Sequence, residues 1–300
     1  MRNGIVLADK PPGMGSTHLV GALRHRLRET YGKIRVGHTG TLDRFASGLM
    51  LLPVGRATAL AEVFLHADKR YEAWFSFGRF TDTHDPTGRT VQEVSHEAAR
   101  EFVAAEKPRI TEELQRFSLV SRQRPPAFSA LKTEGERYSD RARRTGVAEM
   151  PRERSVRIYD IGVDGFDEQA ARVRVSLSVS GGTYVRAIAR DLSELLEFPI
   201  HLSELRRTAI GRITLDVDDI WKAPDGPIRM RSLSGALPEW PQVSVEPGQV
   251  ALIQQGRKVT LRGPLPDPGR DFFLIRGSDG EAVAWAKSQV GGYSYQRVFV

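Results

Sequence analysis

A polar, glycine-rich loop followed directly by an apolar run constrains this chain more than any other stretch. Residues 37–48 contain three glycines, one histidine, two threonines and Asp43, and the apolar residues 49–52 come next. The apolar run predicts a buried strand, and the glycines allow the loop backbone to approach a ligand closely. A carboxylate on a loop that a buried strand supports is a candidate for chemistry, so Asp43 is a candidate catalytic residue. Asp is also a common turn and helix-cap residue, and the loop alone leaves both interpretations open.

The rest of the chain mixes strand and helix patterns. Alternating apolar residues predict strands over 71–77 and 172–179, and short apolar runs predict further strands over 5–8 and 49–52. Apolar residues at helical spacing predict a helix that follows an N-cap at Ser16, and Thr183 is expected to cap another helix that runs to about Leu196. Further helices are expected over 57–66, 96–106 and 111–117.

The charge of the chain is uneven. The formal net charge is +7, and residues 122–154 contain nine Lys and Arg against five Asp and Glu. Clustered basic residues are typical of proteins that bind nucleic acid, although a solvated basic surface has the same composition. The chain has no cysteine and no apolar run long enough for a bilayer span, so we expect a cytoplasmic protein without disulfides.

Two domains are expected. Residues 216–241 are rich in Asp, Pro and Gly, as a domain boundary is, and from Val243 onwards short apolar stretches alternate with turns. We therefore expect one domain over residues 1–241 and a small, mostly β domain over residues 242–300.

The motifs exclude several kinds of site. The histidines lack metal-ligand spacing, so no metal site is expected. Neither a phosphate-binding P-loop nor a dinucleotide fingerprint is present. Gly181-Gly182-Thr183 precedes a helix, where it would form either an anion site or only the turn into that helix. An arginine near Asp43 would keep its carboxylate ionised, and Arg186 is a candidate, although it would otherwise be an ordinary exposed helix residue. Tyr71 would give a flipped base a ring to stack on, or would simply pack in the core.

Several motifs in a fixed order carry a family resemblance. These pieces are Asp9-Lys10-Pro11, His38-Thr39-Gly40-Thr41-Leu42-Asp43, Lys69-Arg70-Tyr71, Thr81-Asp82-Thr83 with Asp85, Pro125-Pro126, Ser129-Ala130-Leu131-Lys132, Gly182-Thr183-Tyr184-Val185-Arg186 and Leu205-Arg206-Arg207. On these motifs, the first 210 residues resemble the TruB-type tRNA pseudouridine synthases. The tail resembles, more weakly, the PUA-type RNA-binding domain of that family.

The resemblance implies roles for six residues. Asp43 matches the catalytic aspartate, and Arg186 matches the arginine paired with it. His38 matches the histidine that helps hold the extruded nucleotide, and the base contacts match Tyr71, Tyr184 and Leu205. One departure is Arg44-Phe45, where the family usually has proline and a small or apolar residue. We expect this pair to loosen the loop and to add charge beside the site.

The resemblance also implies a fold and an activity. The fold expected is α+β, with a mixed, mostly antiparallel central sheet, flanking helices and the C-terminal β domain. The activity is isomerisation of uridine 55 in the T-loop of tRNA to pseudouridine, without a cofactor. The basic segment 122–154 resembles an insertion that closes on the T-arm. We expect a monomer that needs no membrane and no protein partner. A guide-RNA-dependent pseudouridine synthase and a non-catalytic tRNA-folding factor remain the alternatives.

Overall fold

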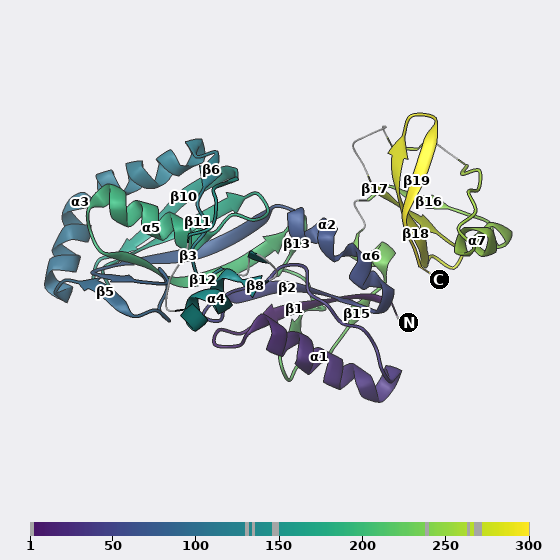
Figure 1. The fold of residues 1–300 in the computed structure, drawn as a ribbon, viewed down its shortest axis with the longest axis horizontal. Helices are drawn as coiled ribbons and strands as arrows, with labels where there is room; N and C mark the ends of the chain where they lie inside the picture. The colour runs from purple at the N-terminus through teal and green to yellow at the C-terminus, as the bar shows by residue number, and fades with distance from the viewer. Residues whose placement is uncertain are drawn as a thin grey trace.

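The chain forms an elongated main body and a smaller C-terminal unit beside it (Figure 1). The computed structural model describes residues 3–129, 132–133, 136–145, 150–237, 240–262, 265–266 and 272–299. None of the helices in these ranges combines the length and the apolar character that crossing a bilayer requires.

The main body is built on a sheet of nine strands within the described ranges. Most neighbours are antiparallel, but β12 pairs with β2 in parallel, and so does β1 with β14. The predicted mixed, mostly antiparallel sheet is therefore confirmed. Its strands, in sheet order, are β10 (Ile158–Asp167), β11 (Arg172–Val179), β3 (Lys69–Phe77), β12 (Ile200–Ile210), β2 (Ser47–Val54), β1 (Gly4–Lys10) and β14 (Trp221–Lys222); β13 (Ile213–Thr214) pairs with β12 and β15 (Met230–Arg231) with β1.

Helices cover both faces of this sheet (Figure 1). The helices are α1 (Ser16–Tyr31), α2 (Ala61–His66) after the 3₁₀ turn Gly55–Leu60, α3 (His96–Arg116) followed by the 3₁₀ turn Phe117–Leu119, α5 (Val185–Leu196) and α6 (Leu233–Ala236). At β1 and β2, Val6 and Met50 join the cluster of α1, whereas Leu7 and Leu49 join the cluster of α2 and α6. Because both faces are covered, the middle of each strand, Ile5–Ala8 and Leu49–Leu52, is continuously apolar.

Several helix predictions were wrong in detail. The residue before α5 is Tyr184, without a side-chain cap, so Thr183 does not cap that helix. The residue before α1 is Gly15, without a side-chain cap, and Ser16 begins the helix and bonds the loop at Leu42 instead. The segment predicted as two helices is one helix, α3, that continues through Pro108. Ile110 and Leu114 beyond the proline are fully buried like Val103 before it, so packing outweighs the local cost of the proline.

The basic segment 122–154 has little regular structure in its described part. β6 (Arg122–Gln123) pairs with β9 (Arg154–Ser155), and between them lie the short pair β7 (Lys132–Thr133) and β8 (Glu136–Arg137) and the helix α4 (Tyr138–Thr145). Ala130, Leu131 and residues 134–135 and 146–149 lie outside the described residues. A further hairpin, β4 (Arg79–Thr81) with β5 (Thr90–Glu93), follows β3.

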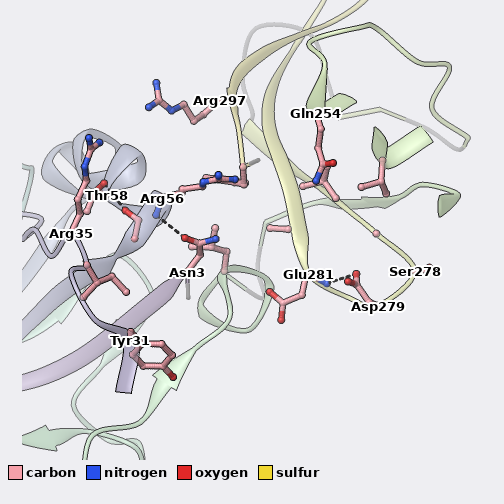
Figure 2. A pocket seen from close by; sticks show the side chains of 18 of the residues that line it. Asn3, Tyr31, Arg35, Arg56, Thr58, Gln254, Ser278, Asp279, Glu281 and Arg297 are labelled. Carbon is pink, nitrogen blue, oxygen red and sulfur yellow. Dashed lines mark hydrogen bonds between the residues drawn. The ribbon is translucent and has the colours of Figure 1, made fainter. Parts of the chain in front are cut away.

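The C-terminal unit is a four-stranded sheet with one helix. Its elements are β16 (Gln242–Ser244), α7 (Pro247–Gln254), β17 (Phe272–Arg276), β18 (Ala282–Gln289) and β19 (Gly292–Val298). Leu274, Trp285 and Phe299 of this unit belong to the same buried cluster as α6 and the main sheet. A cavity of about 1280 Å³ lies beside this contact. Figure 2 shows Arg35 and Arg56 of the main body on one side of this cavity and Asp279 and Glu281 of the C-terminal unit on the other.

Candidate active site

A cavity of about 330 Å³ opens beside Asp43 at the middle of the main sheet. The 40–43 loop, strands β3 and β12, the end of α2 and the start of α5 all contribute to its wall. Five of the six residues predicted for the site line it, namely Asp43, Tyr71, Tyr184, Arg186 and Leu205. Segments as far apart in the sequence as Gly40 and Arg207 therefore line one cavity together with Asp43.

The loop that carries Asp43 is fixed from below by α1. Ser16 Oγ donates to the Leu42 carbonyl at 2.8 Å and accepts from the Leu42 amide at 2.9 Å. The amide of Gly13 donates to the Arg44 carbonyl at 2.7 Å, and Arg44 Nε donates to the Gly13 carbonyl at 2.8 Å. The expected loosening at Arg44 was therefore wrong, because this side chain ties the loop to its neighbour.

A buried lysine lies on the other side of this turn. Lys10 Nζ donates to the carbonyls of Pro11 and Met14, at 2.9 and 2.8 Å. Burial lowers the pKa of Lys10 to about 8, while the nearby Asp43 carboxylate opposes this shift. Lys10 remains mostly cationic at neutral pH and adds positive potential beneath Asp43.

Arg186 holds the Asp43 carboxylate with two hydrogen bonds. Its Nε donates to Oδ2 at 2.8 Å and its Nη2 to Oδ1 at 3.1 Å. The Arg186 side chain is only 4% exposed, whereas that of Asp43 is 39% exposed. The arginine is therefore not the exposed helix residue that the sequence left open. This bidentate geometry fixes the plane of the carboxylate.

A second carboxylate lies behind Arg186. Asp85 Oδ2 lies 3.5 Å from Arg186 Nη1, which also donates to the Thr83 carbonyl at 3.0 Å. Asp85 is itself buried and accepts from the hydroxyls of Thr83 and Thr87 at 2.7 and 2.6 Å. Arg186 is thus clamped between two carboxylates, and only that of Asp43 reaches the cavity.

Two further cations form the floor of the cavity. Lys69 Nζ donates to the carbonyls of Phe64, Leu65 and Ala67, and burial lowers its pKa to about 8. Arg207 is 2% exposed, and its Nε donates to the Leu49 carbonyl at 2.8 Å. Its other nitrogens reach the carbonyls of Gly40 and Thr41, so Arg207 braces the loop that carries Asp43.

Aromatic and apolar side chains form the walls. Tyr71 and Leu205 are nearly buried on β3 and β12. Burial raises the pKa of Tyr184, so its ring stays neutral at physiological pH. The backbone of Tyr184 is fixed by Gln123, whose side-chain amide accepts from its N–H at 2.9 Å and donates to its carbonyl at 3.1 Å. The cavity therefore combines one ionised carboxylate with walls suited to a flat ring.

His38 is the one predicted residue that does not line this cavity. The Gly40 amide donates to His38 Nδ1 at 3.4 Å, which folds the ring back over its own loop. His38 therefore contacts the backbone of its own loop and is not part of the cavity wall.

Comparison with known proteins decides the family. Residues 28–185 match the model of the TruB family pseudouridylate synthase (N terminal domain). A tRNA pseudouridine synthase B from Leptospira interrogans is 36% identical over 303 residues, covering 99% of this chain and 94% of the relative. The chain belongs to the TruB family. It is an isomerase that converts uridine to pseudouridine.

Other relatives extend the match. A tRNA pseudouridine synthase B from Corynebacterium diphtheriae is 33% identical, covering 96% of this chain and 93% of the relative. One from Bordetella avium is 39% identical, covering 71% of this chain and 83% of the relative. The matches to the Leptospira and Corynebacterium proteins therefore include the C-terminal unit.

Solved structures show the same fold. A chain from a Cbf5-Nop10-Gar1 complex superposes with a TM-score of 0.68 at 22% identity, covering 100% of this chain and 85% of the other. A chain from an H/ACA RNP bound to a substrate RNA containing 2'-deoxyuridine gives a TM-score of 0.63 at 18% identity, covering 99% and 85%. At these identities the likeness concerns the TruB-family fold alone.

Several residues of this TruB-family site received no role from the sequence. Asp85, Lys69 and Arg207 all stand inside the matching motifs, so the motif positions were a signal for them. Gln123 and Arg154 lie at the two ends of the basic segment, and their position follows only from the pairing of β6 with β9. A two-residue strand pair has no readable period, so the sequence carried no signal for that contact.

Proposed function

We propose that this enzyme converts uridine 55 in the T-loop of tRNA to pseudouridine. The relatives that match over nearly the whole chain are named tRNA pseudouridine synthase B. The observation that carries the proposal is the bidentate pair of Arg186 and Asp43 in the wall of a cavity that Tyr71 and Tyr184 also line. A tRNA substrate also places the enzyme in the cytoplasm.

Asp43 is the proposed catalytic residue. In the isomerisation the bond between C1′ and N1 breaks, the uracil turns, and C1′ forms a bond to C5 while the C5 proton leaves and N1 gains one. Asp43 is ionised and oriented by Arg186, so it can act as the nucleophile or as the base in this sequence. Either role requires the Asp43 carboxylate to contact the reacting atoms of the nucleotide. None of these steps needs a cofactor.

The walls of the cavity are the proposed binding site for the base. Tyr71 provides a ring for stacking, and Tyr184 and Leu205 close the other sides. The target base is stacked inside a folded arm, so the enzyme flips it into the cavity at a cost of roughly a few kcal/mol. His38, on the loop that carries Asp43, is the proposed residue that helps to hold the extruded nucleotide.

The two parts of the chain have different proposed tasks. Residues 1–241 form the catalytic domain, and the basic segment 122–154 closes on the T-arm. Residues 242–300 form a PUA-like domain that binds RNA outside the T-arm. We propose that the enzyme works as a monomer on tRNA alone, since the relatives named for tRNA are 33–39% identical while the Cbf5 complexes share only the fold.

Release of tritium from C5 of uracil tests this function. The purified protein is incubated with a tRNA transcript labelled at C5, without guide RNA or other protein, and with the same transcript carrying cytidine at position 55. We expect stoichiometric release from the first and none from the second. No release from the first transcript would contradict stand-alone tRNA modification, and equal release from both would contradict the choice of position.

Asp43→Asn tests the catalytic assignment in the same assay. The change removes the charge and keeps the shape, so turnover should vanish, while tRNA affinity, which rests mainly on phosphate contacts, should persist. Arg157→Gln on the exposed surface serves as the control for loss of a charged side chain. Multiple turnovers by a verified Asp43→Asn protein would show that another group does the chemistry.

A further inference from the structure

Arg154 enters the active-site cavity from the basic segment. It lies in β9, where it pairs with Gln123, the residue that clamps the backbone of Tyr184. Its side chain lines the same cavity as Asp43 and Tyr184. The end of the basic segment and the base-binding wall are therefore one structural unit.

The guanidinium of Arg154 lies directly against Gly182. A Cβ at this glycine would lie 2.5 Å from Arg154 Nη2 and 2.9 Å from Cζ. Gly182 also has φ of +88°, which side-chain-bearing residues rarely adopt. The absence of a side chain at Gly182 thus leaves the space that the Arg154 guanidinium fills. This contact gives the Gly181-Gly182-Thr183 motif a role beyond forming the turn into α5.

The donors of the other cations in the cavity are already committed. Arg186 bonds Asp43 and two carbonyls, and Lys69 and Arg207 each bond three carbonyls. Within the described ranges, the side chain of Arg154 makes no hydrogen bond and no ion pair, and only its backbone pairs with β6. The adjacent Glu153 does not neutralise it, because Glu153 pairs with Arg122 and Arg124 at 3.6 and 3.7 Å.

A planar guanidinium with its donors available is suited to a phosphate, which accepts two parallel N–H bonds. A uridine whose base occupies the cavity carries one phosphate on each side of its sugar at the cavity mouth. We propose that Arg154 binds a backbone phosphate that flanks the target uridine, and so holds the flipped nucleotide while Asp43 acts. This rests on the proposed function and adds to it a binding residue specific to the flipped nucleotide.

Neutral phosphates in the substrate test the contact directly. T-arm hairpins are made with a single methylphosphonate on the 5′ or on the 3′ side of the target uridine. Single-turnover rates, with enzyme in excess of the hairpin but below saturation, are measured for wild type, Arg154→Gln and Arg157→Gln. Arg157 is exposed three residues further along and lies outside the cavity, so its variant controls for the loss of one nearby charge.

We expect wild type and Arg157→Gln to lose about tenfold or more at one of the two positions, as the loss of a charge-assisted bond implies. Arg154→Gln should be slower on the unmodified hairpin and should lose less than about twofold further at that same position. Equal sensitivity of Arg154→Gln and wild type would overturn the proposal. So would a wild type that tolerates both neutral phosphates.

A second variant, Arg154→Lys, keeps the test valid if Arg154→Gln destabilises the protein. Should Arg154→Gln lower the melting temperature, Arg154→Lys keeps the charge and the stem beside Gly182 but loses the planar fork. A phosphate effect reduced by at least about threefold then supports the proposal, and an undiminished effect overturns it. Absence of any reaction by wild type on the unmodified hairpin would instead contradict the proposed function, so the two failures are distinguishable.

Discussion

At the scale of single residues, the site depends on how a few buried charges are oriented. Arg186 is bonded to Asp43, to the carbonyls of Thr83 and Phe128, and lies 3.5 Å from Asp85. No other donor in the described chain bonds the Asp43 carboxylate. The geometry of one guanidinium therefore sets the orientation of Asp43, the proposed catalytic residue.

Arg186→Lys separates charge from geometry. Lysine keeps a positive charge beside Asp43, so the acidic limb of the pH–rate profile should move little. It cannot hold both carboxylate oxygens, and such misplacement costs on the order of a hundredfold in rate. Single-turnover rates across pH, at saturating enzyme, measure both effects.

Arg190→Lys is the matched control for this change. Arg190 lies one turn further along α5, is also buried, and bonds Asp191 and the Arg124 carbonyl instead of Asp43. The Arg190→Lys variant should be less stable than wild type but should keep most of its single-turnover rate. A wild-type rate in Arg186→Lys, or a loss that raising the pH restores, would contradict the orienting role.

His84 links stability to pH. It is buried beside Arg190 and Arg186, and burial lowers its pKa to about 4. The unfolded chain, with a His pKa near 6.5, binds a proton that the folded state does not bind until about pH 4. The contribution of His84 to stability is therefore complete above pH 6.5 and falls by about 3 kcal/mol as the pH drops to 4.

His84→Asn tests this, because Asn tolerates the left-handed backbone of residue 84, where φ is 60°. Urea unfolding from pH 4.5 to 8 should show a shallower loss of unfolding free energy on acidification than in wild type. His18→Asn, at an exposed position of α1, should follow the wild-type curve. Parallel curves for wild type and His84→Asn would show that His84 is not the titrating group.

At the scale of elements, the site depends on the close contact between β2 and β12. Gly48 on β2 pairs with Arg207 on β12, and a Cβ at Gly48 would lie 2.3 Å from the Arg207 carbonyl oxygen. The backbone of Gly48 also has φ of +108°. Only glycine fits this contact, which in turn places the Arg207 side chain under the 40–41 carbonyls.

Gly48→Ala should therefore lower both stability and activity. Overpacking against backbone together with a strained φ is expected to cost about 3 kcal/mol or more. Gly21→Ala is the control, since Gly21 lies in α1 with nothing near its Cβ position and should gain about 0.5–1 kcal/mol. Melting temperature and tritium release measure both variants, and an unchanged Gly48→Ala protein would contradict the close contact.

The sequence predicted helices and strands well where an apolar pattern repeats over many residues. It predicted them poorly where a tertiary contact determines the structure. The strand over 71–77 and the helix ending at Leu196 were readable from apolar spacing. The continuity of α3 through Pro108 depends on burial that a local pattern does not contain. In the site, the motifs pointed to Asp43 and Arg186, whereas the position of Arg154 follows from a two-residue strand pair.

At the scale of the whole molecule, the C-terminal unit shares its core with the main body. Trp285 and Phe299 pack in the cluster that contains α6, and residues 216–237 return two strands to β1. The proposed boundary near residue 241 therefore divides the sequence, but the apolar side chains on its two sides pack in one buried cluster. Point substitutions on the surface of the adjacent cavity therefore test the role of the C-terminal unit better than its removal does.

Arg35, Arg56 and Arg297 are exposed around that cavity, far from the α3 end of the molecule (Figures 1 and 2). If the C-terminal unit binds tRNA outside the T-arm, changing all three to Gln should weaken binding of whole tRNA. The log–log salt slope should fall by nearly one unit for each phosphate that the variant no longer neutralises. Modification of an isolated T-arm hairpin should stay at the wild-type rate, because that substrate does not reach the cavity.

A second triple variant controls for net charge. Arg89, Arg100 and Arg116 are exposed near α3 at the opposite end, and changing them to Gln removes the same charge. Filter binding of tRNA and of the hairpin across salt compares the two triples. Equal weakening by both would mean that only the overall field attracts RNA. If the Arg35, Arg56 and Arg297 variant also weakened the hairpin complex, these three arginines would contact the T-arm itself. Either result would contradict a separate tRNA-binding site at the cavity.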